Sequence, residues 1–147
     1  MPTYGYPGPQ LTVDIAVFRR TTMHIEVLLI QRAQEPLKNY WVLPGGFINM
    51  RETLKQSAAR ELEEETGLVA LDLVQVHTYG DPDRDPRGRV VSVAYAALLD
   101  ESTVHPIHPG SDAADSGWFP LEDLRELAFD HQQIIMDAYS WMADRLN

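Results

Sequence analysis

Residues 53–67 carry the clearest structural signal in the chain, a helix with a defined start and end. Thr53 and Gln56 form a capping-box pair at the start, and Gly67 suits the left-handed position after a helix. The last turns of this helix hold four glutamates: Glu61, Glu63, Glu64 and Glu65. Carboxylates at this end oppose the helix dipole, and the first and last of them repel each other one turn apart. Such violations of local rules are typical of functional sites.

The helix also turns three of these carboxylates toward the protein interior. At about 100° per residue, Glu65 falls inside the apolar stripe, which Leu54, Ala58 and Leu62 form. Glu61 and Glu64 fall at its edge. Partly buried like charges need a cation, and carboxylate oxygens suit a hard divalent ion such as Mg²⁺ or Mn²⁺. The plainer interpretation is a solvated acidic face with surface pairs such as Arg60 with Glu64.

Strand patterns surround this helix. Alternating apolar residues predict a strand over 11–17, and a continuous apolar run predicts a strand over 25–30 that is buried on both faces. Three more strands are expected near residues 71–79, 90–99 and 118–119. A short helix is expected from Pro120 and a longer one after Asp130, while 33–50 and 103–117 are predicted to be loops. This order predicts one α/β domain (α+β in some schemes) over residues 1–147, with a mixed sheet and residues 1–10 as an irregular arm.

Charge and composition exclude several classes of protein. The net charge is 12 − 22 = −10, which argues against a nucleic-acid partner. Residues 1–99 carry a net −2 and residues 100–147 a net −8, so the first part can still receive an anionic ligand. The chain has no cysteine, which excludes disulfides and thiolate chemistry and is compatible with the cytoplasm. The longest apolar stretch is ten residues, about half of a membrane span, and no secretory signal precedes the first strand.

The residues around the helix match a known pattern. Gly46, Glu52, Arg60-Glu61, Glu64-Glu65 and Gly67 occupy all seven fixed positions of the Nudix box, G-x5-E-x7-R-E-U-x-E-E-x-G-U, over residues 46–68. The chain therefore resembles the Nudix hydrolase family. The resemblance implies a mixed β-sheet between helices and the Mg²⁺- or Mn²⁺-dependent hydrolysis of a nucleoside diphosphate linked to another group.

The resemblance also implies a role for each box residue. Glu61, Glu64 and Glu65 would bind the metal together with the backbone carbonyl of Gly46, and Glu52 would be a water-mediated ligand. Arg60 would orient the carboxylates, which makes Arg60, Glu61 and Glu64 catalytic residues. Gly45 and Gly46 would bring the backbone close to the metal and the phosphates, although a plain turn is the simpler interpretation. Many members carry an acid in place of Asn49 and a glycine in place of Arg51.

The general base is left open between the box and a later loop. Some members use a box glutamate and others an acid in the loop before the last strand, which makes Asp112 the candidate here and Asp115 the reserve. Both are also ordinary turn residues.

Substrate choice depends on residues outside the box. A proline downstream of the box, in a stretch such as residues 84–88, resembles the ADP-ribose pyrophosphatase branch of the family. Arg84 and Arg87 would contact phosphate or ribose oxygens, unless this stretch is a self-paired surface turn. Arg32, at the end of a strand, is another candidate phosphate contact, unless it only extends its charge to solvent.

The expected function is therefore the hydrolysis of ADP-ribose to AMP and ribose 5-phosphate. The alternatives are a (d)NTP pyrophosphohydrolase that sanitises the nucleotide pool and a non-catalytic nucleotide-sensing domain. Sensors of this kind often carry a DNA-binding domain, for which 147 residues leave no room. The expected partner is a small-molecule nucleotide, with no nucleic acid or membrane; a homodimer is compatible with the resemblance.

Overall fold

The computed structural model describes residues 8–69, 72–99, 106–110, 113–124 and 126–146. The strands are β1 (Gln10–Arg20), β2 (Ile25–Arg32), β3 (Trp41–Val42), β4 (Gly45–Phe47), β5 (Val74–Tyr79), β6 (Val90–Leu99) and β7 (Ala113–Pro120). The helices are α1 (Leu54–Thr66), the 3₁₀ turn η1 (Leu121–Asp123) and α2 (His131–Leu146). None of the helices in these described ranges is long and apolar enough to cross a membrane.

All the strands belong to one mixed sheet. Its main path runs β3-β2-β1-β6-β5, with β4 also paired to β1 and β7 to β2. β1 and β6 run parallel over ten residue pairs at the centre, and the other pairs are antiparallel. The sheet is therefore mixed, as the sequence predicts.

The sheet forks where β1 and β2 separate. β2 pairs with the end of β1 at residues 18–20, whereas β4 pairs with β1 at residues 12–14. The short segment from Trp41 to Phe47 bridges the fork: it leaves the edge of β2 as β3 and joins the edge of β1 as β4. The carbonyl of Pro44, between the two strands, accepts a hydrogen bond from the Ile15 amide at 2.8 Å. The separation of β1 and β2 leaves space beside the bridging segment, whose backbone is held by its hydrogen bonds to β1.

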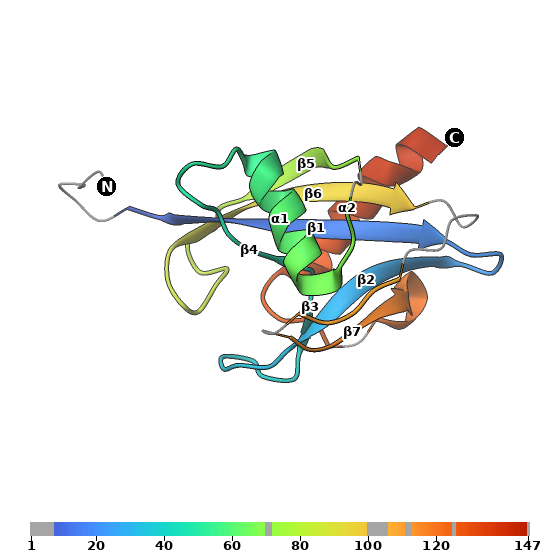
Figure 1. Cartoon of the computed structure of the whole chain (residues 1–147), viewed down its shortest axis with the longest axis horizontal. Helices are drawn as coiled ribbons and strands as arrows, with labels where there is room; N and C mark the ends of the chain where they lie inside the picture. The colour runs from blue at the N-terminus through green and yellow to red at the C-terminus, as the bar shows by residue number, and fades with distance from the viewer. Residues whose placement is uncertain (1–7, 70–71, 100–105, 111–112, 125, 147) are drawn as a thin grey trace.

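The helices cover opposite faces of the sheet, with α1 in front and α2 behind in Figure 1. Side chains alternate along a strand, so β1 contributes to two cores. Val13, Ile15 and Val17 pack toward α1, while Ala16 and Phe18 pack toward α2. The four residues 27–30 of β2 are all buried, which confirms the expected two-sided burial.

The ends of α1 confirm the local prediction. Thr53 accepts from the Gln56 amide, and the Gln56 side chain accepts from the Thr53 amide. Gly67 adopts φ = 82° and donates to the Glu63 carbonyl.

Three predictions of local structure were wrong. The expected loop 33–50 contains β3 and β4, and the expected loop 103–117 ends in five residues of β7. The helix expected from Pro120 is a single 3₁₀ turn. The missed strands are two or three residues long or rich in small polar residues, and they exist because β2 and β1 offer edges to pair with.

Candidate active site

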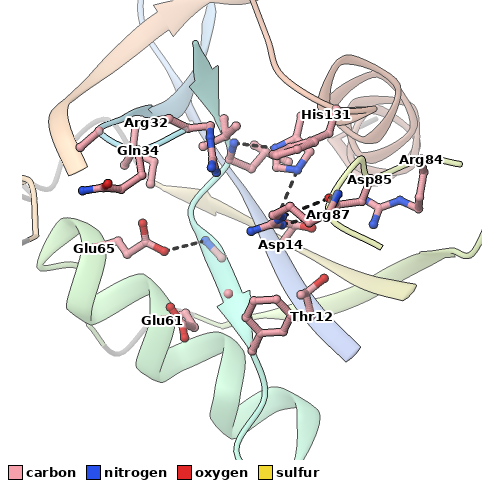
Figure 2. A pocket seen from close by; sticks show the side chains of 18 of the residues that line it. Thr12, Asp14, Arg32, Gln34, Glu61, Glu65, Arg84, Asp85, Arg87 and His131 are labelled. Atoms are coloured by element: carbon pink, nitrogen blue, oxygen red, sulfur yellow. Dashed lines mark hydrogen bonds and ion pairs between the residues drawn. The ribbon is translucent and has the colours of Figure 1, made fainter. Parts of the chain in front are cut away.

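A pocket of about 490 Å³ lies at the fork of the sheet. It is lined by α1, by the bridging segment, by the first half of β1, by the end of β2, by the turn before β6 and by the start of α2. In Figure 2, β4 passes between the α1 carboxylates on one side and Asp14, Arg87 and His131 on the other. The pocket therefore has an acidic side and a side where cations gather.

Arg60 organises the acidic side. Its Nε lies 2.9 Å from both carboxylate oxygens of Glu52, and its Nη1 donates to Glu61 at 2.8 Å. Its Nη2 donates to the carbonyl of Phe47 at 3.1 Å. Ser57 donates to Glu52 at 2.7 Å. One guanidinium thus joins two box glutamates to the end of β4.

The remaining carboxylates differ in burial. The Glu61 side chain is 13% exposed, whereas the Glu64 side chain is 58% exposed and lies 3.4 Å from Arg60. The sequence predicts that Glu61 and Glu64 both lie at the edge of the buried face. For Glu64 this prediction was wrong, because its side chain is exposed. Glu65 accepts a hydrogen bond from the Gly45 amide at 3.2 Å.

Two glycines let the backbone approach these carboxylates. A Cβ on Gly46 would lie 2.6 Å from the carboxylate of Glu61, and a Cβ on Gly45 would lie 2.2 Å from the Val13 carbonyl oxygen. Any other residue at Gly45 or Gly46 would collide with its neighbours, so the two are more than a plain turn.

The acidic side is built from hard oxygen donors. Among the described residues, no three carboxylate, imidazole or thiol groups lie close enough to hold an ion as they stand. Burial raises the pKa of Glu61, with help from the charge of Glu64 and against the pull of Arg60. The Ser57 hydrogen bond, with Arg60, holds the pKa of Glu52 below its ordinary value.

A buried polar cluster forms the floor on the other side of β4. Asp14 accepts a hydrogen bond from Ser92, and its Oδ1 lies 3.6 Å from Nε2 of His131. The Leu43 amide donates to Nδ1 of His131 at 3.0 Å, so the proton of the neutral ring is on Nε2 and faces Asp14. Sequence reasoning missed Asp14 and His131; a carboxylate within an apolar, buried strand was the available signal.

The turn before β6 is largely paired within itself. Arg87 donates to Asp85 at 2.7 and 3.0 Å, and Arg89 donates to the Gly80 carbonyl. Arg84, whose side chain is 4% exposed, forms two 2.8 Å hydrogen bonds with Asp130 just before α2. Arg84 and Arg87 nevertheless line the pocket. Burial raises the pKa of Asp85, but hydrogen bonds from Arg87 outweigh it and leave the pKa below the ordinary value.

Arg32 lies at the end of β2, where it lines the pocket. Its Nε donates to the Pro36 carbonyl at 2.8 Å. Burial lowers the pKa of Arg32, and the charge of Arg87 lowers it further. Two arginines predicted as substrate contacts therefore approach each other in one pocket.

Of the two candidate bases, only Asp115 belongs to the described residues. Asp112 lies outside the described residues. Asp115 is exposed on β7, where its side chain accepts from the Ser116 amide. The amide of Gly110 donates to the Glu65 carbonyl at 3.1 Å, so the described chain before Asp112 is attached to the last turn of α1.

Comparisons with known proteins agree with this architecture. A model of the NUDIX domain matches residues 8–140. The ADP-ribose pyrophosphatase of Methanocaldococcus jannaschii is 40% identical over 136 residues, which cover 92% of this chain and 76% of that protein. The ADPR responsive transcriptional repressor NtrR of Acinetobacter baylyi is 38% identical over 139 residues, which cover 92% of this chain but only 55% of the repressor.

A solved structure shares the whole fold. The NUDIX domain of Shewanella oneidensis NrtR, crystallised with ADP ribose, superposes with a TM-score of 0.86 at 36% identity. The match covers 93% of this chain and 90% of that domain. The α/β class and the mixed sheet between two helices are thus confirmed.

Proposed function

The chain belongs to the Nudix hydrolase family, and we propose that its pocket hydrolyses the pyrophosphate linkage of a nucleoside diphosphate derivative, with ADP-ribose as the lead substrate. The oxygen of a water would bond to one phosphorus, the bond from that phosphorus to the bridging oxygen would break, and the bridging oxygen would leave with the other phosphate, giving AMP and ribose 5-phosphate. The main support for the proposal is the close contact between β4 and α1. Gly46 lies so near Glu61 that a Cβ at Gly46 would collide with the Glu61 carboxylate. Backbone and carboxylates therefore meet where arginines also line the pocket.

The acidic side fits a divalent ion, Mg²⁺ or Mn²⁺, because its donors are hard oxygens beside an open backbone. Glu61, Glu64, Glu65 and the Gly46 carbonyl would hold it, with Glu52 acting through water. Such an ion lowers the pKa of a bound water and offsets the charge of the pyrophosphate. The exposed side chain of Glu64 would leave its 3.4 Å contact with Arg60 to take part.

The chain's own groups would do the rest. Arg60 fixes Glu61 and Glu52 and so keeps the ligand oxygens oriented. Arg32 and Arg87 would bind substrate oxygens, and Gly45 lets the substrate approach the backbone. Arg84 commits three nitrogens to Asp130 and the Val90 carbonyl, which favours a supporting role. Asp112 remains the proposed base.

Product analysis tests the proposal. Purified protein is incubated with ADP-ribose, NADH, diadenosine polyphosphates and (d)NTPs, each with Mg²⁺ and with Mn²⁺, and the products are separated by chromatography. Metal-dependent release of AMP and ribose 5-phosphate from ADP-ribose is expected. A nucleoside monophosphate and pyrophosphate from a triphosphate would instead identify a pool-sanitising enzyme.

A second candidate function is nucleotide sensing without turnover. The similarity to a protein named as an ADPR responsive repressor favours it. The fully matched box favours catalysis, since a sensor does not need every metal ligand. Binding of ADP-ribose with no product from any substrate would establish the sensor. We propose a small-molecule nucleotide as the partner, no nucleic acid, and a cytoplasmic location.

A further inference from the structure

Phe129, the residue that turns the chain into α2, has a backbone conformation that bulky side chains rarely adopt. Its φ is 57°, in the left-handed region. Hydrogen bonds on both sides hold it there: the Ala128 amide donates to the Trp41 carbonyl at 3.0 Å, and the Leu43 amide donates to His131. Unfavourable backbone conformations that the surroundings enforce are concentrated at ligand-binding sites.

The enforced conformation places an aromatic ring on the pocket wall. Phe129 lines the pocket and packs against the small apolar cluster of Ile30, Val42 and Ala128. The guanidinium carbons of Arg32 and Arg87 each lie 5.1 Å from the centre of its ring. Figure 2 shows these two arginines entering the pocket from separate parts of the chain.

Arg87 also contacts a second ring. Its guanidinium carbon lies 5.6 Å from the ring centre of Phe47, at the end of β4. A flat, delocalised cation thus lies against two aromatic rings in a pocket that can take a nucleotide. Arg32 is held by the Pro36 carbonyl, and Arg87 is held by two hydrogen bonds to Asp85. The Arg87 side chain is 38% exposed and belongs to a surface turn, so a ligand can displace its guanidinium from the ring only by also shifting or breaking the pair with Asp85.

We propose that Phe129 is the platform on which the nucleobase of the substrate stacks, and that the guanidinium of Arg87 shifts to admit the base. The inference rests on the proposed function, because it assigns the base end of a nucleoside diphosphate. Aromatic rings bind bases through stacking, and an arginine beside the ring adds a cation–π contact. The two like charges at the ring also attract the phosphates that accompany the base.

The test measures binding without turnover. The probe is 1,N⁶-etheno-ADP-ribose in EDTA, whose fluorescence reports stacking of the base. The variant Phe129→Leu keeps an apolar side chain against the small cluster but removes the ring face. The matched control is Tyr139→Leu. It removes a ring of α2 that packs on Phe18 of β1, outside the residues that line the pocket.

Phe129→Leu should raise the Kd of the probe about tenfold, or about 1.4 kcal/mol, and remove most of the quenching. Tyr139→Leu should leave both unchanged. Ribose 5-phosphate, which has no base, should compete with equal inhibition constants in the unchanged protein and in Phe129→Leu. An unchanged Kd in Phe129→Leu, an equal loss of both ligands, or no binding of the probe by the unchanged protein would overturn the inference.

A parallel assay with ADP-ribose and Mg²⁺ separates this inference from the proposed function. Phe129-dependent binding without any hydrolysis would keep the stacking platform and reject the enzyme. Hydrolysis with an unaltered KM in Phe129→Leu would keep the enzyme and reject the platform.

Discussion

Glu64 is the carboxylate of the acidic side that is most free to move, because its side chain is 58% exposed. Glu64→Gln removes one ligand charge without opening a cavity. We expect kcat for ADP-ribose to fall by about a hundredfold or more, and the free energy of unfolding to change by less than about 0.5 kcal/mol. Initial rates and urea denaturation measure the two quantities. Glu63→Gln, the same change at an exposed neighbour, is the control and should keep its activity. A near-normal kcat for Glu64→Gln would exclude Glu64 from the metal site.

His131 is a buried imidazole that the fold keeps neutral. Burial lowers its pKa, although the charges of Asp14 and Asp130 oppose that effect and Arg84 adds to it. Below about pH 6.5 the unfolded chain binds a proton that the folded protein does not. The stability contributed by His131 is therefore complete above that pH and is lost as the pH falls, by at most about 1.4 kcal/mol per pH unit.

The variant His131→Asn isolates this contribution. An asparagine offers an acceptor to the Leu43 amide and a donor to Asp14, but it does not titrate. Urea unfolding between about pH 5 and pH 7.5 should show a shallower loss of stability in the variant than in the unchanged protein. Because the other histidines are common to both proteins, only the difference in slope is assigned to His131. Equal slopes would mean that His131 is not the source.

At the scale of elements, the turn before β6 is tied to α2 through Arg84 and Asp130, whose side chains are 4% and 27% exposed. If Arg84 acts by holding this turn, Arg84→Gln and Asp130→Asn should raise the KM for ADP-ribose by similar factors. Each should cost about 2 kcal/mol of stability, since removing one charge leaves the other in a largely buried position without its charged partner. The double variant should be little worse than either single one. A much larger rise in KM for Arg84→Gln than for Asp130→Asn would place Arg84 against the substrate.

The elements also show what the sequence could predict. α1 was predictable to its end residues because its signals are local: a capping pair and a glycine terminator. β3, β4 and the start of β7 were not, because strands so short or so polar form only where another strand offers its edge. The contacts of Arg60 with Glu61 and Glu64 follow from spacing along α1. Asp14 is far along the chain from Phe129 and His131, and only the topology brings it to them.

At the scale of the whole molecule, the fork of the sheet explains how one pocket combines unlike surfaces. The face of β1 toward α1 is next to the carboxylates, and the face toward α2 presents Asp14 to His131. β4 separates the two sides and contributes Gly45 and Gly46 to both. A substrate with a pyrophosphate and a base matches such a pocket, because its two ends need different surroundings.

The charge of the whole molecule gives the last prediction. The chain carries −10, of which −8 falls in residues 100–147, and this net charge opposes the binding of a DNA backbone. We expect no binding to a random-sequence DNA duplex at about 50 mM salt, where nonspecific binding is strongest, with or without ADP-ribose. Fluorescence anisotropy of the labelled duplex measures this, and binding of ADP-ribose by the same sample shows that the protein is folded. The repressor relative is covered over only 55% of its length, so its repressor activity need not reside in the shared part. DNA binding that ADP-ribose alters would favour the sensor over the enzyme.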